Sequence, residues 1–187
     1  MSTIETARVL IMQQLTSMSR CDFAIRDREG TVVGAVVTGG GAFARFTSGP
    51  RQLTVLDSDG NAYVHLDDIP NLGPDRFEMY AADGRCIGSV TKEVTFLRRR
   101  ITVDIAGHAY ELAERDFAER TFDLLGPHGR VAVVRRAWPD MLHSLLDRNT
   151  YVVGFETNQN PTVRRAALGA VLALELVRLK DRRQRGV

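Results

Sequence analysis

Along most of the chain, apolar and polar residues alternate with a period of two, and turns that contain glycine interrupt the alternation at short intervals. Such alternation predicts strands with one buried face, and Asp-Gly or nearby glycines favour tight hairpin turns between them. The predicted strand pairs, in chain order, are 23–26 with 31–37, 53–56 with 62–66, 77–80 with 86–90, 101–105 with 108–112 and 122–125 with 131–134. The pattern therefore predicts a meander of antiparallel hairpins.

The pattern changes after a last predicted strand at 151–155. A turn at 158–161 places Pro161 near the start of a helix that we expect to span about 161–183. Residues 166–174 carry no polar side chain, so this part of the helix must be buried in protein or in lipid. A bilayer requires about 20 apolar residues, and Glu175 ends the run well before that length. We therefore expect burial in protein, with Leu168, Val171 and Leu172 in the core.

Several curved hairpins wrapped around this helix would cover it on every side, and closing the sheet would remove exposed strand edges. The predicted fold is thus mainly β: one domain over 1–187, a closed antiparallel barrel of hairpins around a central apolar C-terminal helix. The segment 9–14 also has strand character. It has two open interpretations, pairing within the barrel or pairing between chains.

Composition narrows the function classes. The 25 basic and 23 acidic residues leave a net charge of only +2, which argues against a nucleic-acid partner. Lys92 and Lys180 are the only lysines, so the positive charge is almost all arginine. Cys21 and Cys86 are too few for a disulfide framework and lack the spacing of a zinc site. No secretory signal precedes the first strand, so we expect a cytoplasmic protein.

The order of hairpins, last strand and buried helix resembles the superfamily that contains phospholipid scramblases, Tubby C-terminal domains and LURP-one-related proteins. The resemblance covers nearly the whole chain and is most specific between Trp138 and Glu175. The stretch 136–138 looks like the basic residue and structural tryptophan that precede the last strand of scramblases, and 147–155 looks like the segment after it. The small-residue run at 165–170 and the later Glu175 are similar to the family's helix. The resemblance implies a twelve-stranded barrel around the helix, in a superfamily associated with phosphoinositide-rich membranes, with lipid scrambling or with no established activity.

In scramblases the segment that matches 147–158 is described as a calcium-binding segment with acidic residues at three positions. Those positions fall here on Asp147, Asn149 and Asn158, of which only the first is a carboxylate. Calcium sites take several oxygen ligands, with carboxylates among them. We therefore expect a polar turn leading into a strand, and no metal site.

Nothing in the sequence predicts an enzyme or a cofactor. The four histidines are scattered without a metal-ligand spacing, and no nucleophile elbow is present. The glycine run at 39–44 matches the residue pattern of a dinucleotide-binding fingerprint. That fingerprint needs a βαβ unit around it, and here hairpins follow, so we expect no dinucleotide site.

The arginine clusters are the most suggestive polar feature. The candidate residues for anionic phospholipid headgroups or phosphates are Arg98, Arg99, Arg100, Arg135, Arg136, Arg164 and Arg165. One hypothesis is a non-enzymatic peripheral or scaffold protein, which binds anionic phospholipids at the inner membrane surface through arginines on the barrel exterior. The alternative is a cytoplasmic module that binds an unidentified protein partner. Lipid scrambling is less favoured, because no transmembrane span and no cysteine-rich acylation segment is predicted.

Overall fold

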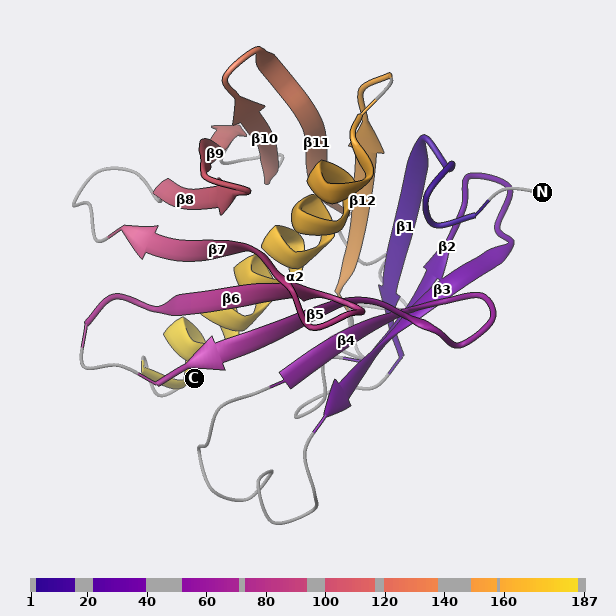
Figure 1. Ribbon diagram of the computed structural model, residues 1–187, viewed down its shortest axis with the longest axis horizontal. Coiled ribbons are helices and arrows are strands. Elements are labelled where there is room, and N and C mark those ends of the chain that lie inside the picture. Colours follow the sequence, from indigo (N-terminus) through magenta and orange to yellow (C-terminus); the bar gives the residue numbers. More distant parts are fainter. Residues whose placement is uncertain are drawn as a thin grey trace.

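The computed structural model describes residues 3–15, 22–39, 52–70, 73–93, 100–116, 120–137, 149–157 and 159–184. These residues form twelve strands and one long helix (Figure 1). The strands are β1 (Val9–Gln14), β2 (Phe23–Arg26), β3 (Val32–Gly39), β4 (Gln52–Asp57), β5 (Ala62–Ile69), β6 (Arg76–Ala81), β7 (Cys86–Glu93), β8 (Arg100–Ile105), β9 (His108–Asp116), β10 (Thr121–Gly126), β11 (Gly129–Ala137) and β12 (Thr150–Phe155). The helix is α2 (Pro161–Gln184).

The strands follow one another around a closed antiparallel barrel, and β1 completes the ring by pairing with β12 on one side and β2 on the other. This confirms the predicted closed antiparallel barrel and all five predicted hairpins. It also answers the question that the sequence left open, because β1 pairs within the barrel. Every strand therefore has two neighbours, and the sheet has no open edge.

Side-chain chemistry explains the tight hairpin turns, as the connection between β4 and β5 illustrates. The Asp57 carboxylate accepts hydrogen bonds from the backbone N–H groups of Asp59 and Asn61, at 2.9 and 2.8 Å. These bonds, that from Asn61 above all, lower the pKa of Asp57. Gly60 then adopts a φ of 84°, which glycine accepts without steric cost. The sequence predicted this turn from the same residues.

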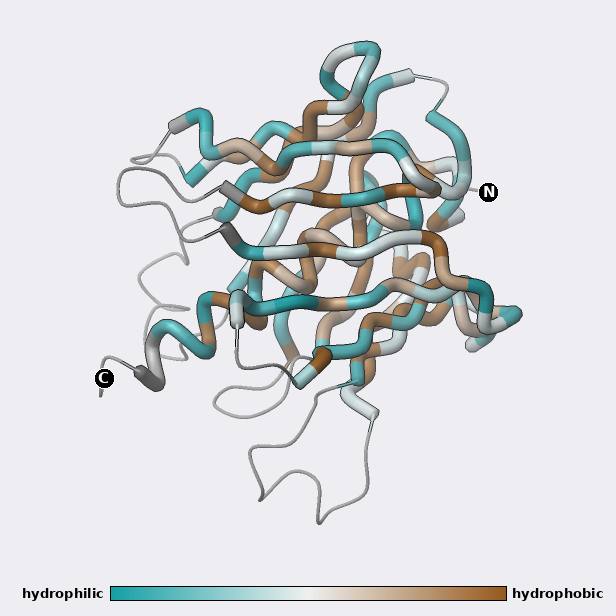
Figure 2. The backbone as a smooth tube through the Cα atoms, turned by 60° about the vertical axis from the view of Figure 1, so that its left-hand side comes forward, coloured by the Kyte–Doolittle hydropathy of each residue, from teal (hydrophilic) through white to brown (hydrophobic). Residues whose placement is uncertain are grey.

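Helix α2 fills the barrel, with strands on every side of it (Figure 1). Its residues from Ala166 to Val177 are all buried, including Leu168, Val171 and Leu172. Small residues allow close contact with the sheet: a Cβ added to Gly169 would lie 2.5 Å from the Sδ of Met79 on β6. Along strands such as β6 and β8, buried hydrophobic residues alternate with more polar ones. Figure 2 shows such alternation of hydropathy along the backbone.

The two ends of the barrel differ. Because neighbouring strands are antiparallel, the five tight turns lie at one end, where β12 finishes and α2 begins. The C-terminal part of α2 lies at the opposite end, where β1 and β11 finish and β12 starts. Within the part of the chain that the structure describes, no helix combines the length and the apolar character needed to cross a bilayer.

Candidate functional site

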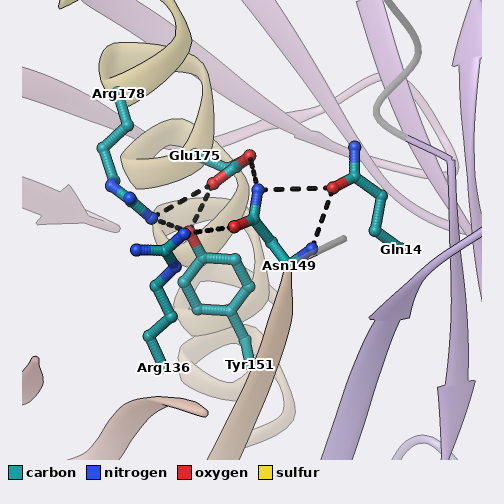
Figure 3. Close-up of polar contacts among 6 residues, drawn as sticks. All are labelled: Gln14, Arg136, Asn149, Tyr151, Glu175 and Arg178. Carbon is teal, nitrogen blue, oxygen red and sulfur yellow. Dashed lines mark hydrogen bonds and ion pairs between the residues drawn. The ribbon is translucent and has the colours of Figure 1, made fainter. Parts of the chain in front are cut away.

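A cluster of polar side chains lies inside the barrel, beside the C-terminal half of α2 (Figure 3). At its centre is Glu175, whose side chain is only 2% exposed. Asn149 donates a hydrogen bond from Nδ2 to Oε1 of Glu175 over 2.7 Å, and the Tyr151 hydroxyl donates to Oε2. An isolated buried carboxylate would be strongly destabilising, so these hydrogen bonds and the cations nearby are what make the position tolerable.

Two arginines supply those cations (Figure 3). Arg178 lies one turn further along α2, with Nη1 at 3.6 Å from Oε2 of Glu175 and at 2.9 Å from the Tyr151 hydroxyl oxygen. Arg136 reaches in from β11 and donates from Nη2 to Oδ1 of Asn149. Two guanidinium groups against one carboxylate give the cluster a net charge of about +1.

The cluster also joins the two strands that close the barrel. The side-chain oxygen of Gln14, at the end of β1, accepts hydrogen bonds from the backbone N–H of Asn149 at 3.1 Å and from its Nδ2 at 3.3 Å. The backbone N–H of Gln14 donates to the carbonyl oxygen of Asn149 over 2.9 Å. Thus β1, β11, β12 and α2 meet at one point, although they lie far apart in the sequence.

Burial controls the electrostatics of this cluster. Burial, together with the positive charge of Arg178, which has a smaller effect, lowers the pKa of Arg136 to about 10. Burial likewise raises the pKa of Tyr151, and the neighbouring Glu175 carboxylate adds to that effect. Tyr151 therefore keeps its proton and remains a hydrogen-bond donor. In the described part of the chain, Nε and Nη1 of Arg136 have no hydrogen-bond partner.

Arg164 and Arg165 lie at the other end of α2, and they fasten the residues before β1 to the helix. Arg164 donates from Nη2 to the carbonyl oxygens of Ala7 and Ile4, at 2.6 and 3.2 Å, and its guanidinium lies 4.0 Å from the centre of the Phe155 ring. Burial lowers the pKa of Arg164. Arg165 pairs with Glu5 at 2.8 Å.

The sequence hypothesis placed its candidate arginines on the exterior, and for Arg136 and Arg164 this is wrong. Both are buried, with 8% and 7% exposure. For β11 the reason is strand geometry: Ala132 and Val134 face the core, so Arg136 does too, and Arg135 faces outward. Arg135 is exposed, and its neighbours in the register are Thr121 and Val152.

The remaining candidates are placed only in part. Arg100 begins β8, whereas Arg98 and Arg99 lie outside the described residues, as do Trp138, Asp147 and Asn158. Of the three calcium-like positions, only Asn149 is described, and its side-chain oxygen accepts a hydrogen bond from the cationic Arg136. The described residues contain no group of three or more acidic, histidine or cysteine side chains that could hold a metal ion.

Lysine–carboxylate pairs join the C-terminal part of α2 to the barrel. Lys180 bonds to carboxylate oxygens of Asp68 and Asp75, at 2.8 and 2.9 Å, and Lys92 bonds to Asp181 at 2.6 Å. Burial lowers the pKa of Lys180, but the combined hydrogen bonds and charges of Asp68 and Asp75 outweigh it, and the pKa is raised. Both lysines of the chain thus hold the helix to β5 and β7.

Sequence reasoning missed the interior cluster, and in particular Gln14, Tyr151 and Arg178. One signal was available: Glu175 follows the apolar run 166–174 directly, so a helix buried along that run carries the carboxylate into the barrel. Arg178 follows Glu175 by one turn of the same helix, so the same signal applies to it. The other partners could not be found in this way, because they come from strands, or from the residue just before one, whose pairing the sequence did not determine.

Comparison with known proteins agrees with the geometry. A family model described as LURP-one-related matches residues 8–173, which include every strand and more than half of α2. No curated protein matches the chain. No solved structure matches it either.

Proposed function

The chain belongs to the LURP-one-related family of the Tubby-like superfamily, and from this premise we propose that it is a non-enzymatic peripheral protein that binds membranes containing anionic lipid. The barrel interior is filled by α2 and the side chains packed on it, so a partner of any size meets the exterior or the ends of the barrel. The distribution of charge over the exterior is therefore what supports one partner over another.

The observation that carries the proposal is the arrangement of acidic residues around the barrel. The five neighbouring strands β11, β12, β1, β2 and β3 contain no acidic residue, and we call them the acid-free sector. Each of the seven strands from β4 to β10 contains at least one. The arginines of the acid-free sector are Arg26, Arg130, Arg135 and Arg136.

This asymmetry favours one orientation at an anionic surface. Each basic residue close to such a surface contributes about 1 kcal/mol, and acidic residues oppose binding. With a net charge of only +2, the whole molecule has little attraction, so binding depends on which side faces the lipid. The acid-free sector brings the exposed Arg135 to the surface and keeps the carboxylates of β5 to β9 away from it.

The proposal is tested by reversing one charge on each side of the barrel. We expect Arg135→Glu to weaken binding to vesicles of equal parts phosphatidylcholine and phosphatidylserine, measured by co-sedimentation at low salt. Arg85→Glu is the matched control, because Arg85 is exposed in the turn between β6 and β7, away from the acid-free sector. The control should bind like the wild type. Equal binding by the two variants would contradict the proposal. So would a wild-type protein that binds no vesicle and instead retains a specific protein partner.

A further inference from the structure

The outward side chains of the acid-free sector form a row of unusual composition. In the register of the barrel, Arg135 of β11 lies beside Val152 of β12, Val152 beside Ile11 of β1, and Ile11 beside Arg26 of β2. Two aliphatic side chains thus lie between two arginines. Strands are about 4.8 Å apart, so the ends of the row are separated by about 14 Å.

The next row toward the tight-turn end is also apolar. There Val133 of β11 lies beside Gly154 of β12, and Gly154 beside Val9 of β1. These residues point outward, because their neighbours along each strand, such as Leu10 and Val153, are fully buried. A sheet with one face in water normally carries polar side chains on that face, and here it does not.

The opposite side of the barrel has the expected polar exterior. Asp67 of β5 lies beside Glu78 of β6, Glu78 beside Ser89 of β7, and Ser89 beside Asp104 of β8. All four side chains are partly exposed, and their neighbours along the strands are buried. The exterior is therefore two-sided, with carboxylates on one side and aliphatic and arginine side chains on the other.

We propose that the aliphatic face, defined as Val9, Ile11, Val133 and Val152 with Arg26 and Arg135 at its ends, is the surface that docks on the bilayer. Charge complementarity selects the partner: the face has two cations at its borders and lies on strands that contain no acidic residue, which matches an anionic lipid surface. The carboxylate of Glu156, just after β12, is paired with Arg130 at 2.7 Å. The aliphatic side chains enter the boundary between headgroups and acyl chains, and the two guanidinium groups bind lipid phosphates on either side of them. Arg26 is held in place by a 2.9 Å hydrogen bond from its Nη1 to the carbonyl oxygen of Gly30.

This inference rests on the proposed function, and the experiment separates the two. In the variant Ile11→Thr/Val152→Thr, β-branched residues are kept, so the strands are preserved while the apolar surface is reduced. We expect its binding to phosphatidylserine-containing vesicles to be about tenfold weaker than that of the wild type. Ile69→Thr is the matched control, because Ile69 lies on β5 beside Arg76, on the acidic side of the barrel, and it should bind normally.

A second measurement reports insertion directly. Ile11→Trp should show a blue-shifted emission and quenching by lipids brominated on their acyl chains, beyond the signal of Trp138 in the wild type. Ile69→Trp should show neither. The docking proposal would be overturned if the double threonine variant bound vesicles as well as the wild type, or if a tryptophan at position 11 were not quenched. It would also be overturned if the wild type were a dimer that the double threonine variant converts to a monomer. If one of these contradicting results is obtained while the wild type still binds anionic vesicles, the docking surface is wrong and the proposed function stands. If the wild type binds no vesicles, both the docking surface and the proposed function are wrong.

Discussion

Asn149 donates a 2.7 Å hydrogen bond from its side-chain amide to the Glu175 carboxylate, and so connects the start of the last strand to the buried helix. Both residues are buried, and Arg136, Tyr151 and Gln14 complete the arrangement around them. Because β1 and β12 close the barrel at this position, we assign the cluster a structural role: it fixes the depth of α2 and the register of the closing strands.

Removing the carboxylate should test that role. Glu175→Ala leaves the buried Arg136 and its neighbour Arg178 without a counter-charge, and we expect it to lower the free energy of unfolding by about 3–5 kcal/mol. Glu175→Gln keeps the volume and an acceptor, so we expect a loss of about 1–2 kcal/mol. Urea unfolding measures both. If the alanine variant were as stable as the glutamine variant, the cluster would not hold the helix.

Tyr151 makes stability dependent on pH above 10. Its pKa is raised in the folded protein, so above the ordinary value of about 10 the unfolded chain loses the proton that the folded protein keeps, and stability falls as pH rises. We expect Tyr151→Phe to be about 1 kcal/mol less stable at neutral pH, and this difference should shrink above pH 10. Arg136, with a pKa lowered to about 10, has the opposite effect, but both proteins contain it. A constant difference between pH 7 and 11 would exclude this assignment.

The central position of α2 predicts a large contrast between two leucines. Leu172→Asp puts an unpaired charge at a position that is 1% exposed, and we expect no soluble folded protein. Leu125→Asp makes the same change on β10 at a position that is 39% exposed, and it should fold and melt normally. Expression and thermal melting distinguish them. A soluble Leu172→Asp protein with a cooperative melting transition would show that the helix is not in the core.

The ion pairs of Lys180 should contribute modestly to holding the end of the helix. Lys180→Met removes the contacts to Asp68 and Asp75 and leaves the mostly buried Asp68 without its cation. Because the lysine side chain is 34% exposed, screening by water reduces the loss, and we expect about 1–2 kcal/mol. Arg76→Met, which breaks the more exposed pair with Glu78, should cost less than about 0.5 kcal/mol. Chemical unfolding of the two variants side by side gives the comparison.

Local rules explain how much of this molecule could be predicted from its sequence. The hairpins could be recognised because turn residues such as Asp57 and Gly60 lie beside the strands that they join. Burial of α2 followed from nine consecutive apolar residues. The pairing of β1 with β12 could not be derived, since residues about 140 positions apart meet there and nothing local encodes their register.

The candidate site was less predictable than the fold. The sequence hypothesis treated Arg135 and Arg136 as one cluster, although alternation along a strand sends them to opposite faces. The interior cluster needs four elements brought together by long-range pairing. The aliphatic face likewise becomes visible only when the register places Val152 beside Ile11, because each strand alone reads as an ordinary apolar run.

The most direct test of the central claim is co-sedimentation of the wild-type protein with vesicles of phosphatidylcholine alone and of phosphatidylcholine with phosphatidylserine, at low and at high salt. The proposed function predicts that the protein sediments only with the anionic vesicles and that high salt weakens this binding. A protein that stays in the supernatant with both kinds of vesicle, or that binds both equally at either salt concentration, would contradict it.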